Sequence, residues 1–101
     1  MVDEIIPGPI QFEWDKGNIN KNFNKHKVSN EEAEEVFTNE PIIEIEEGVK
    51  NNIKEKRRLV LGISDKGKLL SIIFTIRKNK IRIISARPQS RKERRKYAKE
   101  V

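Results

Sequence analysis

Three apolar segments joined by two short links constrain the fold of this 101-residue chain more than any other feature. The segments span residues 57–64, 68–77 and 80–87, and they are rich in residues that favour strands. Between them stand Asp65-Lys66-Gly67 and Lys78-Asn79, which are hairpin-type connections. Links this short allow only antiparallel pairing, since parallel strands need a long crossover. The pattern therefore predicts an antiparallel sheet, with the most continuously apolar strand, 68–77, at its centre.

Ahead of these segments, the sequence predicts a short strand followed by a helix. Apolar and polar residues alternate near the start, as is typical of a half-buried strand, with the apolar positions at Ile10, Phe12 and Trp14. Asp15 stands where it can cap a helix, and Trp14 and Ile19 have the spacing of a hydrophobic staple. Ile19 and Phe23 then lie one turn apart on one face of that helix.

A second helix is predicted to begin at Ser29. Ser29 and Glu32 have the spacing of a capping box. The buried stripe that follows consists of Ala33, Val36 and Phe37. Asn39-Glu40-Pro41 ends this helix, because the residue before a proline avoids the helical region. A strand at 42–45 and a polar loop at 46–56 then lead into the three main strands.

A basic helix is predicted at the C-terminus. Ser90 and Glu93 repeat the capping-box spacing, so Glu93 is most simply a capping residue. The inward stripe of the helix is predicted to consist of Arg94, Tyr97, Ala98 and Val101. An arginine in such a stripe departs from good patterning, and departures of this kind occur more often at functional sites. Arg94 is thus either a catalytic residue or a salt-bridge anchor for the helix.

Together these elements predict a single α+β domain over residues 10–101, in which helices pack on a mainly antiparallel sheet of about four strands. Residues 1–9 are predicted to be a flexible tail, since Pro-Gly-Pro at 7–9 opposes regular structure. The absence of cysteine excludes disulfides and thiolate metal sites. No apolar stretch approaches the roughly 20 residues that span a bilayer. Because a signal-peptide pattern is also missing, we expect a cytoplasmic protein with no membrane partner.

Positive charge is concentrated at the C-terminal end. Residues 77–101 hold 11 Lys or Arg against 2 acidic residues, whereas residues 1–76 hold 11 Lys or Arg against 14 acidic residues. This asymmetry is typical of a polyanion-binding end on an acidic body, and it favours a nucleic-acid partner. The alternative is a basic helix whose charges are only solvated.

Four pieces of sequence stand in a distinctive order. They are "FEWD" at 12–15, "KHKVSNEEAEEVF" at 25–37, Arg57 five residues before Gly62 in "RRLVLG", and "IRIISARPQSRKERRKY" at 81–97. Together they resemble the BrnT family, whose members are toxins of type II toxin–antitoxin systems. The resemblance implies a fold similar to RelE and ParE toxins. It also implies a ribonuclease that needs no metal or other cofactor and arrests translation. The implied partner is a BrnA-like ribbon-helix-helix antitoxin, and operator DNA is bound only through the toxin–antitoxin complex.

Cleavage of RNA without a metal makes specific demands on side chains. The 2′-hydroxyl of the substrate attacks the phosphate, a base takes its proton, and an acid protonates the departing 5′-oxygen. Arginine suits the stabilisation of phosphoryl charge, because its planar fork donates two hydrogen bonds to one phosphate. The predicted catalytic residues are His26, Arg57, Arg82, Arg87 and Arg94, and the predicted RNA-binding residues are Arg91, Lys92, Arg95 and Tyr97.

Several of these candidates have a structural alternative. His26 is the single histidine, and histidine suits proton transfer near neutral pH, but at a helix C-terminus it also bonds free carbonyls. Side chains alternate along a strand, so Arg82 and Arg87 are predicted on opposite faces unless twist or a bend before Pro88 brings them closer. Arg82 either lies on an exposed active face or pairs with a glutamate. Tyr97 is most simply a core residue with its hydroxyl at the boundary.

Other classes of function also fit the sequence. A non-catalytic nucleic-acid-binding surface predicts salt-sensitive binding without cleavage. A protein-interaction module would use the basic helix and the open sheet face to bind an acidic or helical antitoxin. A ParE-like toxin would act on gyrase, a protein target, and not on RNA.

Overall fold

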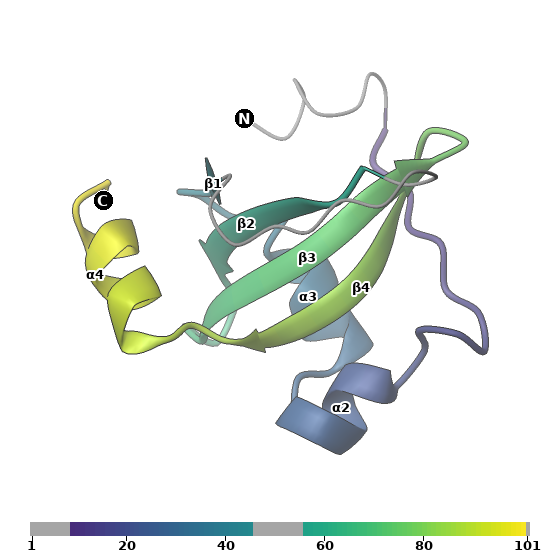
Figure 1. Cartoon of the computed structure of the whole chain (residues 1–101), viewed down its shortest axis with the longest axis horizontal. Coiled ribbons are helices and arrows are strands. Elements are labelled where there is room, and N and C mark those ends of the chain that lie inside the picture. Colours follow the sequence, from purple (N-terminus) through teal and green to yellow (C-terminus); the bar gives the residue numbers. More distant parts are fainter. Residues whose placement is uncertain (1–8, 46–55, 101) are drawn as a thin grey trace.

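A computed structural model of the chain describes residues 9–45 and 56–100. Its sheet has four antiparallel strands in the order β1-β2-β3-β4 (Figure 1). They are β1 (Ile43–Ile45), β2 (Arg58–Ile63), β3 (Leu69–Arg77) and β4 (Lys80–Pro88). The predicted α+β class and antiparallel pairing are confirmed, and β3 lies between two partners as expected. The predicted tail and the predicted loop at 46–56 lie almost wholly outside the described residues.

Both hairpin links have the backbone geometry that their residues favour. Gly67 has a φ of 88°, which glycine adopts without a steric penalty. Lys78 and Asn79 both have positive φ values, 52° and 64°, as a two-residue turn between right-twisted strands requires. Turn chemistry at these two positions therefore sets the register of the main strands.

One face of the sheet carries the main core. Helix α3 (Asn30–Glu35) lies against this face, and helix α2 (Lys21–His26) lies beside β4 (Figure 1). The buried core consists of Val28, Ala33, Val36, Phe37, Val60, Leu70, Ile72, Phe74, Ile81, Ile83 and Ala86. The predicted capping box of α3 is present, since the Ser29 hydroxyl accepts the Glu32 N–H and the Glu32 carboxylate accepts the Ser29 N–H. Gly62 lets β2 approach α3, because a Cβ there would lie only 2.5 Å from Val36 Cγ1.

The first helix does not begin where the sequence predicts. Residues 16–20 form turns, and α2 starts only at Lys21, after Asn20 in the left-handed region. The carboxylate of Asp15 accepts the Gly17 N–H and also binds Arg82, so it caps a turn and no helix. Ile19 and Phe23 are 46% and 48% exposed, so the predicted staple is wrong.

The predicted N-terminal strand is reduced to a single parallel bridge between Phe12 and Ile81. After this bridge, the chain turns and covers the outer edge of β4 with two buried asparagines. The Asn18 amide donates to the Ile83 carbonyl, and the Asn22 side chain accepts the Ala86 N–H. Side chains therefore satisfy edge groups that a longer strand would have paired.

Helix α4 (Arg91–Ala98) follows the end of β4 and lies on the β2 side of the sheet, whereas α2 lies beside β4 (Figure 1). Its predicted capping box is present, and of its predicted inward stripe Tyr97 is buried as expected, but Arg94 and Ala98 are not. Arg94 and Ala98 are exposed, whereas Glu93 is half-buried and Tyr97 is buried with its hydroxyl donated to the Pro41 carbonyl. Glu93 faces the sheet because Arg87 neutralises its charge there. The remaining predicted stripe residue, at position 101, is outside the described residues.

Candidate functional site

An irregularity in β4 decides where its two arginines point. Arg82 pairs with Thr75 and Arg87 pairs with Ser71, while Ile84 has no partner on β3 and forms a bulge. Paired residues share a face, and positions 71 and 75 lie on the same face of β3. The bulge therefore puts Arg82 and Arg87 on one face, and the prediction of opposite faces is wrong. A single extra residue reverses the alternation, as a β-bulge is known to do.

Arg57 joins the same side of the sheet. Leu59 pairs with Ile73, so alternation places position 57 on the face that carries Thr75. The Thr75 hydroxyl donates to the Lys56 carbonyl at 3.0 Å, which holds the start of β2 against β3. We call the surface formed by Arg57, Arg82 and Arg87 the arginine face. The attachment points of Arg82 and Arg87 are about 13 Å apart, from four strand residues of about 3.3 Å each. Helix α3 covers the opposite face.

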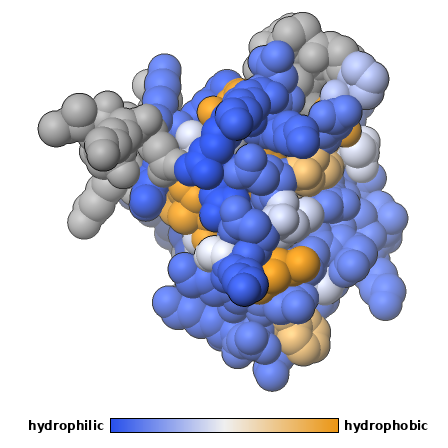
Figure 2. Space-filling model, turned by 90° about the vertical axis from the view of Figure 1, so that its right-hand side faces the viewer, coloured by the Kyte–Doolittle hydropathy of each residue, from blue (hydrophilic) through white to orange (hydrophobic). Residues whose placement is uncertain are grey.

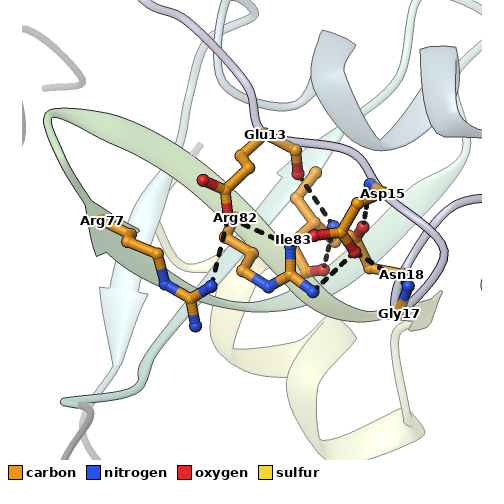
Figure 3. Close-up of polar contacts among 7 residues, drawn as sticks. All are labelled: Glu13, Asp15, Gly17, Asn18, Arg77, Arg82 and Ile83. Carbon is orange, nitrogen blue, oxygen red and sulfur yellow. Dashed lines mark hydrogen bonds and ion pairs between the residues drawn. The ribbon is translucent and has the colours of Figure 1, made fainter.

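Two carboxylates converge on Arg82 (Figure 3). Arg82 binds Asp15 through both terminal nitrogens, at 2.9 and 3.0 Å, and Nη1 also binds Glu13 at 3.0 Å. The hydrogen bond from Arg82 and the Gly17 N–H lower the pKa of Asp15, and the pKa of Arg82 is raised, chiefly by the hydrogen bond to Asp15. Arg82 thus combines the two predicted alternatives, because it lies on the arginine face and is also ion-paired.

Exposure around this pair is uneven. The Arg82 side chain is 14% exposed, whereas that of Asp15 is 54% exposed. Gly17 makes room for the guanidinium, since a Cβ at that position would lie 2.9 Å from Arg82 Nη2. The arginine is therefore fixed by its surroundings, while its main partner remains open to solvent and to exchange with another anion.

Arg87 is held by α4. Its Nη1 and Nη2 bind the two oxygens of Glu93 at 2.8 and 3.0 Å, and Ser71 donates to the same carboxylate. Burial raises the pKa of Glu93, but the hydrogen bonds from Arg87 and from the Ser90 N–H outweigh it, so the net pKa is lowered. Glu93 is therefore ionised at neutral pH. It caps α4, as predicted, and it also orients an arginine.

The outer surface of α4 is strongly basic. Its exposed side chains include Arg91, Lys92, Arg94 and Arg95. Tyr97 points the other way, and burial raises its pKa. This burial favours an anchoring role for Tyr97 over the predicted contact with RNA. The helix thus adds exposed cations beside Arg87, which Glu93 holds in place.

His26 stands apart from the arginine face. It is half-buried at the end of α2, and within the described residues Arg82 and Arg87 form their hydrogen bonds with other partners, namely Glu13, Asp15, Glu93 and the Pro88 carbonyl. Sequence reasoning missed the carboxylates that hold the arginines, Glu13 and Asp15. Their signal was present in the acidic positions of "FEWD". No group of three His, Asp or Glu side chains in residues 9–45 and 56–100 is placed to hold a metal ion.

Comparison with known proteins identifies the family. The family model described as "Ribonuclease toxin, BrnT, of type II toxin-antitoxin system" matches residues 14–93. This span includes the arginine face, Asp15, Glu93 and the start of α4, while Glu13 lies one residue before it. None of the helices in the described part of the chain is long and apolar enough to cross a membrane. A search of curated proteins finds no match. Since the family match covers most of the sequence, the chain belongs to the BrnT family of ribonuclease toxins of type II toxin–antitoxin systems.

Proposed function

We propose that this toxin cleaves RNA by metal-independent attack of the 2′-hydroxyl, in the manner of RelE-type toxins, and so arrests translation. A BrnA-like ribbon-helix-helix antitoxin neutralises it, and the complex of the two binds operator DNA. The observation that carries the catalytic proposal is the bulge at Ile84, which brings Arg82 and Arg87 to one face beside the basic surface of α4.

Both arginines keep donors for a phosphate. A guanidinium has five N–H donors. Within the described residues Arg82 makes three hydrogen bonds, to Glu13 and Asp15, and Arg87 makes three, to Glu93 and the Pro88 carbonyl. Carboxylate and phosphate present similar bidentate acceptors to arginine. The exposed Asp15 is the partner that a phosphate of RNA replaces most easily, since exposed ion pairs contribute little.

The chemistry divides among these groups. Arg57, Arg82 and Arg87 stabilise the negative charge that develops on the phosphoryl oxygens, which is usually the largest catalytic contribution. Arg91, Lys92, Arg94 and Arg95 bind the flanking phosphates and position the strand without reading its sequence. His26 is the candidate for proton transfer, and an RNA strand that reaches from the arginine face to the end of α2 would be needed to engage it.

Cleavage of purified RNA by the isolated chain tests this function. The reaction is run with excess EDTA, and the new ends are mapped for a 2′,3′-cyclic phosphate. Replacement of Arg82 or Arg87 by alanine is expected to reduce the rate by about 10²–10³-fold, as for loss of one transition-state donor. Lys66→Ala, in the β2–β3 turn, removes the same charge away from the face and is the matched control.

Three results would contradict the proposal. Cleavage that stops on addition of EDTA would exclude the metal-independent route. Salt-sensitive RNA binding without cleavage would make the chain a nucleic-acid-binding module. Growth arrest with intact cellular RNA would point to a protein target, as in a ParE-like toxin.

A further inference from the structure

The segment 16–27 exposes two large apolar side chains. Ile19 and Phe23 are 46% and 48% exposed, and they are the large hydrophobic residues found exposed in the described part of the chain. The lower part of Figure 2, at the height of α2, shows apolar surface set among hydrophilic residues. Single exposed apolar residues are ordinary, but two on one short segment, which packs on β4 through Asn18 and Asn22 and leaves both apolar side chains outside, indicate a binding surface.

The same segment is rich in positive charge. Four lysines of the same segment are exposed, namely Lys16, Lys21, Lys25 and Lys27. Within residues 9–45 and 56–100 none of them forms an ion pair, and the segment contains no acidic residue. Lys27 Nζ lies 5.5 Å from the centre of the Phe23 ring. Lys21 and Lys25 stand two positions from Phe23 and so project from the other flank of α2, which leaves Lys27 as the lysine placed at the apolar pair. We call the surface formed by Ile19, Phe23 and Lys27 the α2 surface.

The α2 surface is held firmly in place by the rest of the fold. Asn18 and Asn22 are buried and bonded to the edge of β4. Asn20 and Asn30 form reciprocal hydrogen bonds that tie the turn to α3. The surface is already ordered, so binding of a partner loses little free energy to ordering of the toxin.

We propose that the α2 surface docks an acidic amphipathic helix of the antitoxin. This inference rests on the proposed neutralisation by an antitoxin and names the kind of segment that binds. Apolar residues one turn apart on such a helix cover Ile19 and Phe23, while a carboxylate meets Lys27 and the other lysines of the segment attract its negative charge. None of the residues of the α2 surface belongs to the arginine face, so the helix anchors the antitoxin without itself covering that face.

Other occupants fit the α2 surface less well. A single strand of RNA would stack on the Phe23 ring, but it would gain nothing from the aliphatic Ile19, and Lys27 already lies over the ring. A second copy of the chain would bring two lysine-rich segments together, which like charges disfavour. An acidic helix uses both the apolar pair and the adjacent Lys27, and the positive charge of the whole segment attracts it.

Affinity measurements with the antitoxin from the neighbouring reading frame test the proposal. Titration calorimetry compares the unmodified chain with Phe23→Ala and with Lys27→Glu, which reverses the charge beside the Phe23 ring. Each is expected to weaken binding by about tenfold or more. Lys66→Glu reverses a charge in a distant turn and should leave affinity within about twofold. Circular dichroism confirms that the exposed substitutions leave the fold intact.

RNA cleavage by Phe23→Ala separates this inference from the function on which it rests. Cleavage by this variant should stay unchanged, since Phe23 lies outside the arginine face and its substitution removes no charge that a phosphate could bind. Unchanged antitoxin affinity would overturn the docking site whether or not the chain cleaves RNA. Loss of RNA binding in Phe23→Ala would assign the surface to RNA, and a dimer that dissociates in Phe23→Ala would assign it to a second copy.

Discussion

Glu93 both stabilises the fold and holds Arg87 on the arginine face, so replacing it tests the two roles together. The side chain caps α4 through the Ser90 N–H, binds Arg87 with both oxygens and accepts the Ser71 hydroxyl. Glu93→Ala removes the cap, which costs about 1 kcal/mol. It also removes the Arg87 pair, and because Arg87 is 37% exposed, solvent screening limits that contribution to about 0.5–1 kcal/mol.

The two losses sum to about 2 kcal/mol, which corresponds to a fall in Tm of roughly 8–16 °C for a domain of this size. Glu93→Gln keeps an oxygen acceptor for the cap and loses only the charge. It should therefore cost about 0.5–1 kcal/mol, or roughly 2–8 °C. Thermal unfolding followed by circular dichroism measures both differences at pH 7.

The lowered pKa of Glu93 also predicts how its contribution to stability changes with pH. The folded pKa of Glu93 lies below the ordinary value of 4.5, so its ionised form stabilises the fold at neutral pH. This contribution is lost as the pH falls from 4.5 through the folded pKa. The stability difference between the unmodified chain and Glu93→Gln should therefore shrink at acid pH. A difference that stays constant from pH 7 to pH 3 would refute the assignment of the Arg87–Glu93 pair.

Three further predictions follow from single contacts. Gly62→Ala places a Cβ against Val36 and should destabilise the fold by about 1–3 kcal/mol in urea unfolding, with partial recovery in the double variant with Val36→Ala. Strict additivity of the two changes would contradict the contact. Gly17→Ala displaces the guanidinium of Arg82, so RNA cleavage should fall while Tm changes little; equal cleavage would show that the position of Arg82 is not critical. Tyr97→Phe removes one hydrogen bond to a backbone carbonyl and should cost about 1 kcal/mol in urea unfolding, and no loss would indicate that this bond is replaced by water.

Local chemistry explains which parts of the fold the sequence predicts well. The capping boxes at Ser29 and Ser90 involve residues three positions apart, so both are visible in the sequence and both form. The turns at Gly67 and at Lys78-Asn79 likewise depend on the backbone preferences of their own residues. These four signals place the ends of α3, α4 and the main strands.

Long-range contacts explain the misses. Asp15 has the position of a helix cap, but Arg82, which is 67 residues away, binds its carboxylate. The stripe rule assumes that apolar residues face inward, yet Glu93 faces inward because Arg87 neutralises it. In both cases a charged partner that is remote in the sequence overrides a local preference. No pattern within a few residues reports such a partner.

The bulge at Ile84 and the late start of α2 are linked by the hydrogen bonds of two asparagines. The flanks of Ile84 carry two edge groups, the Ile83 carbonyl and the Ala86 N–H, and these bond Asn18 and Asn22. A helix that began at Asp15 would carry these asparagines in a different orientation along its own axis. Because residues 16–20 form turns, the predicted helix loses its first turn. The amides of Asn18 and Asn22 then lie where they bond the Ile83 carbonyl and the Ala86 N–H beside the bulge. Since the bulge sets the direction of Arg82, the N-terminal segment determines the geometry of the arginine face through its asparagines as well as through Asp15.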